Sequence, residues 1–200
     1  MKITIDPHVK ALIFDVDGTL ADSMPVHLAA WQVVADKYNF VYTRENLHAF
    51  AGMSGQEIVA VINERNGKRL DPDEIAYEKE RLFLDKLDEV RPIQPVVDVL
   101  ERYHKLMPVA AGTGGYRNVA TRILQSIGIY DRFDTLISAD DVERHKPHPD
   151  TFLECAGAMG VDPADCLVFE DAELGFQAAR RAGMHLIDVR PYYNGHDKYA

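Results

Sequence analysis

The sequence predicts an α/β protein: a Rossmann-like, doubly wound parallel sheet core with an inserted small α-helical cap domain. Short apolar runs rich in β-forming residues recur along the chain, and helix-like segments alternate with the last four of them. Such continuous runs are typical of parallel strands that are buried on both faces. The first run is separated from the second by a long segment, residues 15–107. A crossover between parallel strands needs only about a dozen residues, so this segment is expected to hold an additional structure.

Apolar runs bounded by turn or cap residues are predicted to form the strands of the sheet. They are residues 10–14, 107–111, 135–138, 166–169 and 185–189. The helix-like segments between the last four runs are residues 116–127, 150–159 and 172–182. Strands and helices that alternate in this way form a parallel sheet covered by helices on both faces.

The long segment after the first strand is predicted to be a helical domain. Apolar residues recur at helical spacing along residues 24–38. Ser54 and Asp71 each lie three residues before a glutamate, which marks two further helix starts. Pro92 and Pro95 mark the return of the chain to the core. The predicted boundaries are residues 1–21 and 89–200 for the α/β core and residues 22–88 for the cap domain.

The composition is that of an ordinary soluble globular protein. Acidic residues outnumber basic ones by 32 to 22, the formal net charge is −10, and no basic cluster suited to a nucleic-acid backbone is present. The sequence lacks the apolar run of a signal peptide or a membrane span. Cys155 and Cys166 are predicted to be free thiols. We expect a cytoplasmic protein with no nucleic-acid or membrane partner, and an exposed or frayed tail at residues 192–196.

Two carboxylates directly follow the first predicted strand, in the run Phe14-Asp15-Val16-Asp17-Gly18-Thr19. Residues two apart in extended backbone point to the same side, so Asp15 and Asp17 would project together at the carboxyl edge of the sheet. Carboxylates this close repel each other unless a cation or a shared proton intervenes. The pattern therefore predicts a metal site or an acid/base pair; a solvated Asp-Gly turn is the alternative.

A second acidic pair, Glu170-Asp171, ends the predicted strand at residues 166–169. If this strand returns beside the first, the two acidic ends face each other where the strand order reverses. A set of oxygen ligands favours a hard cation such as Mg²⁺. Alternatively, Glu170 and Asp171 place negative charge at the N-terminus of the helix at residue 172, which is also favourable. Both interpretations can hold together.

The other two strand ends supply groups that suit a phosphate. The run Gly112-Thr113-Gly114-Gly115 opens a helix, where a hydroxyl and free backbone N–H groups can hold an anion. Lys146 lies in a loop with two prolines, although a lone lysine is more often solvated. Together with the carboxylates, these groups form the set that phosphoryl transfer requires, because charge on the phosphoryl oxygens must be neutralised.

The order of these motifs resembles that of the haloacid dehalogenase superfamily, in particular its branch of β-phosphoglucomutases and sugar-phosphate phosphatases with a helical cap. The resemblance spans about residues 10–190 and includes the runs at residues 168–172 and 175–184. Within this branch the chain is most similar to bacterial fructose-1-phosphate phosphatases. The resemblance implies a small phosphorylated metabolite as substrate and a cap that closes over the site. We expect a monomer or a weak homodimer.

The resemblance also implies a role for each motif. Asp15 would be the nucleophile that becomes an aspartyl-phosphate, and Asp17 the general acid and base. Thr113, the N–H of Gly114 and Lys146 would hold the phosphoryl group. The implied ligands of Mg²⁺ are Asp15, the main-chain carbonyl of Asp17, Glu170 and Asp171.

Two residues of the insert match substrate-facing cap residues of the phosphoglucomutase branch. His27 is one of them, with a half-buried helical histidine as the alternative. Lys79 is the other, but it has a glutamate on each side, so a solvated charged face is equally compatible. His145 and His148 have a spacing that could suit a metal, but no thiol or third nitrogen ligand accompanies them, so a supporting role in the loop is predicted.

The leading prediction is a Mg²⁺-dependent phosphatase. A β-phosphoglucomutase and a catalytically inactive binding or regulatory protein are the alternatives. A mutase needs a fixed cation in the cap for a second phosphate. In the mutase branch a lysine and an arginine flank a Gly-x-Ser motif of the cap, whereas Ala51 and Gly55 occupy these positions here. The polar Ser-Lys after the phosphate-binding turn is replaced by Gly115-Tyr116, although Arg117 or Lys79 could compensate.

Overall fold

A computed structural model describes residues 3–193. Within these residues the main sheet has five parallel strands, in the order β5-β4-β1-β6-β7. The strands are β1 (Ala11–Phe14), β4 (Val109–Gly112), β5 (Thr135–Ile137), β6 (Cys166–Glu170) and β7 (His185–Asp188). The central strand is β1, and its Ile13 lies between Ala110 of β4 and Val168 of β6. The predicted α/β class with a doubly wound parallel sheet is confirmed.

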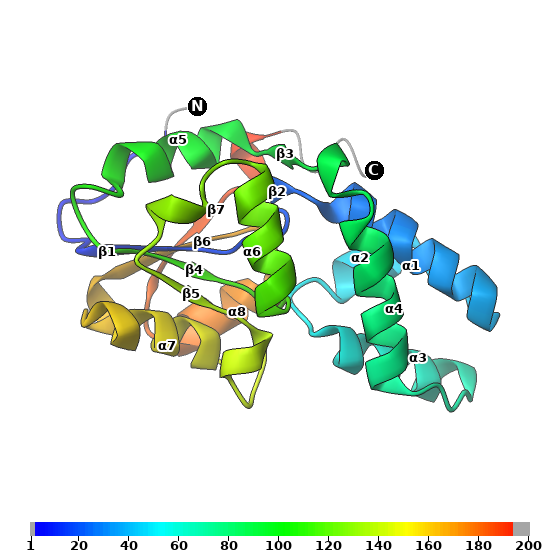
Figure 1. Ribbon diagram of the computed structural model, residues 1–200. Coiled ribbons are helices and arrows are strands. Elements are labelled where there is room, and N and C mark those ends of the chain that lie inside the picture. Colours follow the sequence, from blue (N-terminus) through cyan, green and yellow to red (C-terminus); the bar gives the residue numbers. More distant parts are fainter. Residues whose placement is uncertain (1–2, 194–200) are drawn as a thin grey trace.

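Helices cover both faces of this sheet (Figure 1). The helices are α5 (Gln94–Tyr103) and α6 (Arg117–Ser126) on one face, and α7 (Asp150–Met159) and α8 (Glu173–Arg181) on the other. Successive residues of a strand point to opposite faces. Accordingly, Leu12 and Phe14 of β1 belong to a hydrophobic core shared with α5 and α6, whereas Ala11 and Ile13 belong to a second core shared with α7 and α8.

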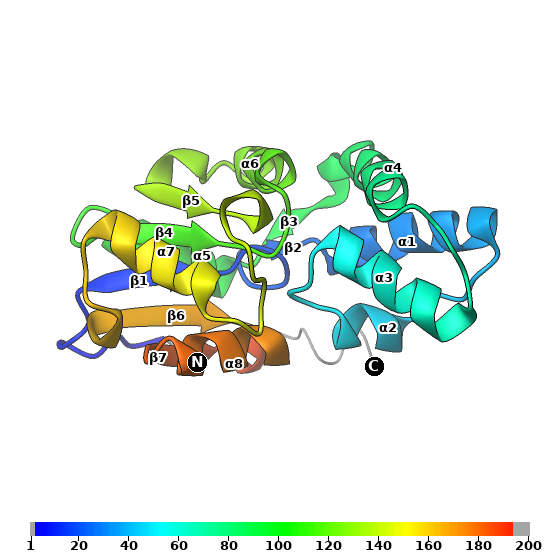
Figure 2. The same cartoon turned by 90° about the horizontal axis from the view of Figure 1, so that it is seen from below.

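Residues 24–84, the first part of the segment between β1 and β4, form helices that lie beyond one end of the sheet (Figures 1 and 2). They are α1 (Met24–Tyr38), α2 (Arg44–Ala49), α3 (Gly55–Asn66) and α4 (Pro72–Leu84). Their apolar faces form a third hydrophobic core. Short antiparallel strands, β2 (Ala21–Asp22) and β3 (Arg91–Pro92), pair where the chain leaves and re-enters the α/β part. The domain boundaries at residues 22 and 88 stay a prediction.

The helix starts of this insert follow from local chemistry. Ser54 accepts a hydrogen bond from the backbone N–H of Glu57, and the Glu57 side chain accepts one from the backbone N–H of Ser54. This is the reciprocal capping box that the sequence indicates. Asp71 accepts from the backbone N–H groups of Asp73 and Glu74, with Pro72 at the first helical position. Both predicted starts are therefore correct.

Some predicted boundaries differ from the structure. Strand β4 begins at Val109, not at Met107, because Pro108 has no N–H to donate to the ladder, although its carbonyl accepts from Leu12. Tyr192 and Tyr193 are half-buried against the core, whereas an exposed or frayed tail was expected; the rest of that tail lies outside the described residues. Short 3₁₀ turns are η1 (Leu87–Glu89), η2 (Tyr130–Arg132), η3 (Ala139–Asp141), η4 (Pro163–Asp165) and η5 (Arg190–Tyr192). Across residues 3–193, the structure has no helix of the length and apolarity required to span a bilayer.

Candidate active site

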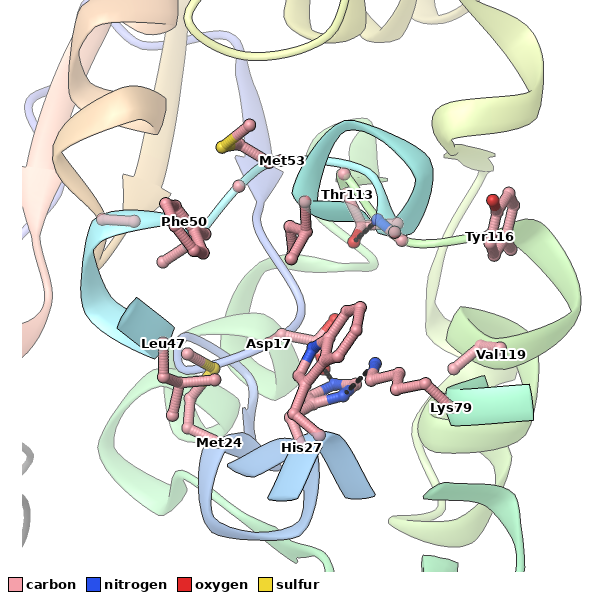
Figure 3. A pocket seen from close by; sticks show the side chains of 18 of the residues that line it. Asp17, Met24, His27, Leu47, Phe50, Met53, Lys79, Thr113, Tyr116 and Val119 are labelled. Atoms are coloured by element: carbon pink, nitrogen blue, oxygen red, sulfur yellow. Dashed lines mark hydrogen bonds and ion pairs between the residues drawn. The ribbon is translucent and has the colours of Figure 1, made fainter. Parts of the chain in front are cut away.

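The carboxyl ends of the sheet strands bring the predicted site residues together. Ligands of open α/β sheets bind at this edge, where the strand order reverses, and here it reverses at β1, with β4 and β6 on either side. A cavity opens at this edge, between the sheet and the helical insert (Figure 3). The predicted residues that line it are Asp15, Asp17, His27, Lys79, Thr113, Gly114 and Glu170. Lys146 and Asp171 do not line it, but each lies beside Asp15 and Glu170.

Carboxylates of Asp15, Glu170 and Asp171 form a buried acidic cluster, with ligand oxygens that all lie within 4.8 Å of one another. Burial, followed by the charge of Glu170, raises the pKa of Asp15 to about 7. The same two causes raise the pKa of Asp171 well above its ordinary value. Among the described residues, these three carboxylates share a single lysine as counter-charge. Their oxygens are therefore suited to bind an additional hard cation.

Lys146 is the cation of the cluster, and its side chain is fully buried. Its Nζ donates to Asp15 Oδ1 and to Glu170 Oε2, both at 2.7 Å, and to the Gly112 carbonyl at 3.3 Å. Burial alone would lower the pKa of Lys146, but Asp15 and Glu170 more than offset this and raise it. Lys146 therefore stays charged beside the nucleophile candidate, and the alternative of a solvated lysine is wrong.

Glycines make room for the cluster. A Cβ at residue 18 would lie 2.2 Å from Asp171 Oδ2, and a Cβ at residue 175 would lie 1.9 Å from Glu170 Oε2. The other oxygen of Glu170 accepts hydrogen bonds from the backbone N–H groups of Asp171 and Ala172, each at 3.0 Å. These contacts fix the Glu170 carboxylate at the end of β6, with Lys146 on one side and the helix start on the other.

Asp17 is held by residues of the insert. Its Oδ1 accepts from the Ser23 hydroxyl at 2.6 Å and lies 2.9 Å from His27 Nε2. Lys79 Nζ lies 2.7 Å from His27 Nδ1. A lysine ammonium can only donate, so Nδ1 accepts and Nε2–H donates to Asp17. Burial alone would raise the pKa of Asp17, but His27, Ser23 and Lys79 bring it below its ordinary value.

His27 and Lys79 both belong to the cavity, as Figure 3 shows. The His27 ring stacks on Phe83 at a centroid distance of 4.0 Å. Lys79 is only 5% exposed, and its Nζ lies 5.7 Å from the centroid of the Trp31 ring. The alternative of a solvated charged face is therefore wrong for Lys79.

The turn after β4 forms the opposite wall of the cavity. Thr113 is buried, and its Oγ1 accepts from the Gly115 N–H at 3.0 Å. The insert reaches this turn directly, because a Cβ at residue 114 would lie 2.4 Å from the carbonyl oxygen of Gly52. Only glycine allows the two backbones to approach this closely. The insert and the sheet edge thus meet closely at this wall of the cavity.

Away from the carboxylates the cavity is mostly apolar and aromatic. Residues of this kind on its wall are Met24, Trp31, Tyr42, Leu47, Phe50, Met53, Ile58, Tyr116 and Val119. Among the described residues that line the cavity, Lys79 is the only lysine or arginine. Arg117, a possible substitute cation, is not on this wall and donates instead to Asp140 and Asp141. The wall therefore offers little charge for a second phosphate.

Some site residues were not found from the sequence. Ser23, which donates to Asp17, directly precedes a predicted helix, and this position could have identified it. Thr19 belongs to the D-x-D-G-T run and donates to Asp171 Oδ1 at 3.2 Å. Tyr193 donates to the carbonyl of Gly18, a contact between distant segments for which the sequence holds no local signal. His145 is half-buried and His148 exposed, and the acidic cluster among residues 3–193 includes neither.

Comparison with known proteins agrees with this geometry. The family model for haloacid dehalogenase-like hydrolases matches residues 12–189. The chain is 45% identical to fructose-1-phosphate phosphatase YqaB of Escherichia coli (strain K12) over 180 residues. The matched region covers 90% of this chain and 95% of that protein. It is 29% identical to β-phosphoglucomutase of Bacillus subtilis (strain 168), over 90% of this chain and 83% of the relative. A crystal structure of β-phosphoglucomutase from Clostridium difficile has a TM-score of 0.80 at 26% identity, and covers 89% of this chain and 83% of that chain. The resemblance inferred from the motifs is thereby confirmed: the chain belongs to the haloacid dehalogenase-like hydrolase family.

Proposed function

We propose that this hydrolase is a Mg²⁺-dependent phosphatase of small phosphomonoesters, in particular sugar phosphates such as fructose-1-phosphate. The observation that supports this most is the position of Asp15, which contacts Lys146, belongs to the acidic cluster with Glu170 and Asp171, and faces the cavity. The 45% identity to a fructose-1-phosphate phosphatase supports the substrate class. We also propose that the protein acts in the cytoplasm, as a monomer or a weak homodimer.

The reaction begins with attack by Asp15. Its carboxylate oxygen forms a bond to phosphorus while the bond between phosphorus and the ester oxygen breaks, which leaves an aspartyl-phosphate. Lys146 holds the other oxygen of Asp15 and offsets negative charge on the phosphoryl group. Thr113 Oγ1 and the N–H of Gly114 bind phosphoryl oxygens. Mg²⁺, held by Asp15, the Asp17 carbonyl, Glu170 and Asp171, would supply further positive charge to these oxygens.

Asp17 transfers the protons. It enters the first step as the carboxylic acid, with a proton taken up from solvent, and gives this proton to the leaving ester oxygen; the carboxylate then takes one from the water that attacks phosphorus and releases inorganic phosphate. Ser23 and His27 bind its Oδ1, so that Oδ2 faces the phosphate-binding turn, 3.7 Å from where a Cβ of residue 115 would lie. The pKa of Asp17, lower than usual before substrate binds, suits its role as the base in the second step.

Hydrolysis is favoured over phosphoglucomutase chemistry by the charges on the cavity wall. A mutase must hold a second phosphate far from the nucleophile. Here Lys79 already contacts His27 and Glu80, and Arg117 is paired outside the cavity. The residues 22–88 would act as a cap that excludes bulk water and selects the leaving group.

The proposed function is tested by phosphate release from a panel of phosphorylated metabolites, including fructose-1-phosphate, with purified protein in Mg²⁺. Release from at least one sugar phosphate, and none from the Asp15→Asn variant, is expected. A second assay supplies β-glucose-1-phosphate with catalytic glucose-1,6-bisphosphate. Formation of glucose-6-phosphate faster than inorganic phosphate would overturn the hydrolase assignment in favour of the mutase.

A further inference from the structure

Glu80, on α4 next to Lys79, lines the cavity, and the proposed reaction gives it no role. Its side chain is only 12% exposed. The Oε1 atom accepts a hydrogen bond from Lys79 at 3.2 Å. The Oε2 atom is buried and has no hydrogen-bond partner within residues 3–193. A buried carboxylate oxygen without a donor is costly, so this atom calls for a donor from outside the chain.

The charge of Glu80 also changes what the cavity can bind. Lys79 is the only lysine or arginine on the described wall, and the carboxylate of Glu80 offsets its positive charge. The carboxylate also acts on the far wall: after burial, its charge is the next cause that raises the pKa of Tyr116 to about 12. A phosphate placed in this part of the cavity would therefore meet a negative charge. A neutral hydroxyl would instead find an acceptor.

Tyr42 is a second residue of the wall with an unsatisfied polar atom. It stacks on Trp31 at 5.0 Å between ring centroids, which fixes the orientation of its ring. Its hydroxyl is buried and has no partner among the described residues. Ligand sites are typically apolar walls with a few polar groups that orient the ligand. Glu80 and Tyr42 both line the cavity and match this pattern, beside apolar wall residues such as Leu47 and Phe50 (labelled in Figure 3).

From these observations we infer that Glu80 accepts a hydrogen bond from a hydroxyl of the substrate's leaving group, and that the Lys79–Glu80 pair limits the site to substrates with a single phosphate. This inference rests on the proposed phosphatase function and specifies its substrate class: monophosphates of polyhydroxylated leaving groups. Bisphosphates are rejected because the Oε2 side of Glu80 repels the second phosphate.

The test compares two substrates that share a primary phosphate ester, fructose-1-phosphate and n-propyl phosphate, which lacks hydroxyls. Glu80→Met removes the acceptor and keeps the length of the side chain. It should lower kcat/KM for fructose-1-phosphate about tenfold or more and change that for n-propyl phosphate less than about twofold. Glu78→Met is the matched control, because Glu78 pairs with Lys37 and does not line the cavity. This control should leave both values unchanged.

A second variant tests the charge. Glu80→Gln retains an acceptor but loses the negative charge, so it should raise the rate on fructose-1,6-bisphosphate relative to fructose-1-phosphate by about tenfold. Circular dichroism shows whether Glu80→Met folds. If it does not, the rate ratio in Glu80→Gln still tests the inference. Equal losses of kcat/KM on both monophosphates in Glu80→Met, or an unchanged rate ratio of bisphosphate to monophosphate in Glu80→Gln, would overturn this inference but not the proposed function. A wild-type protein that releases phosphate from no ester would overturn the proposed function and this inference with it.

Discussion

At the level of single residues, Asp15 and Glu170 both contact Lys146 and line the cavity, but both oxygens of Glu170 are already engaged, one by Lys146 and one by backbone N–H groups. We expect Asp15→Asn to abolish phosphate release, since a neutral amide does not attack phosphorus. The fold should persist, because asparagine has the same shape and Glu170 still pairs with Lys146. Phosphate release and circular dichroism measure the two effects. Activity in variant protein that mass spectrometry shows to be free of deamidation would contradict the nucleophile role.

In the proposed reaction Asp17 takes part in two proton transfers, and substrates with different leaving groups separate them. With an alkyl phosphate, Asp17→Asn should lower kcat by about a hundredfold or more. With p-nitrophenyl phosphate the leaving group needs no proton, so the first step should survive while hydrolysis of the aspartyl-phosphate is slow. Stopped-flow absorbance should then show a burst of one p-nitrophenol per protein, followed by slow turnover. An unchanged steady-state rate on the alkyl phosphate would remove Asp17 from the mechanism.

At the level of elements, the insert approaches the sheet edge closely where Gly52 faces Gly114. A methyl group at residue 114 would overlap backbone atoms of Gly52, at 2.4 Å from its oxygen and 2.9 Å from its carbonyl carbon. Backbone atoms cannot rotate away as a side chain can. The insert would have to shift outward, which opens the cavity to water.

Gly114→Ala should therefore lower kcat/KM by about tenfold or more, because closure positions the reacting groups. Gly157→Ala is the control, since a Cβ at this position of α7 meets nothing within 4 Å. That substitution should leave kcat/KM unchanged and stabilise the helix by roughly 0.5–1 kcal/mol. Steady-state kinetics and thermal unfolding measure both variants. Wild-type kinetics in Gly114→Ala would show that the close approach does not matter for turnover.

Elements with a local signal could be predicted from the sequence. The apolar run of β6 and the capped start of α3 were found because hydrophobic periodicity and cap residues act within a few positions. The β2–β3 pairing was missed because each strand has only two residues, Ala21–Asp22 and Arg91–Pro92, too short for any pattern. The sequence places motifs on elements, but a pairing this short depends on where the whole insert begins and ends.

The same distinction applies to the site. Asp15 and Glu170 could be predicted to converge, because both end strands of one parallel sheet. The burial of Lys79 could not, since glutamates on both sides in sequence are equally typical of an exposed helix face. Its contact with His27 depends on how α1 packs against α4, which periodicity alone does not specify. Glu80 was also missed, because it belongs to no motif and only the structure shows that its Oε2 atom lacks a hydrogen-bond partner among residues 3–193.

At the level of the whole molecule, the proposed anionic substrate would bind a protein of net charge −10. Lys146 contacts Asp15, the proposed nucleophile, and Lys79 contacts His27 on the insert. Lys146 is outnumbered by the carboxylates of Asp15, Glu170 and Asp171. In the proposed reaction, the balance of charge around the phosphate would therefore depend on a bound cation as much as on the chain itself.

Mg²⁺ binding should consequently stabilise the whole protein. At a hundredfold excess over its Kd, Mg²⁺ should raise the Tm of the wild type by roughly 5–10 °C, because it binds the folded state only. Asp171→Asn keeps the shape and the Thr19 contact but removes one charge, so without divalent ions this variant should be at least as stable as the wild type. It should gain much less from Mg²⁺. Asp165→Asn, which removes a carboxylate near Lys10 and outside the cluster, should keep the full shift.

Ca²⁺ should raise the Tm as well but inhibit turnover, since it accepts more oxygen ligands at longer distances. An equal Mg²⁺ shift in Asp171→Asn and wild type would place the ion outside the acidic cluster.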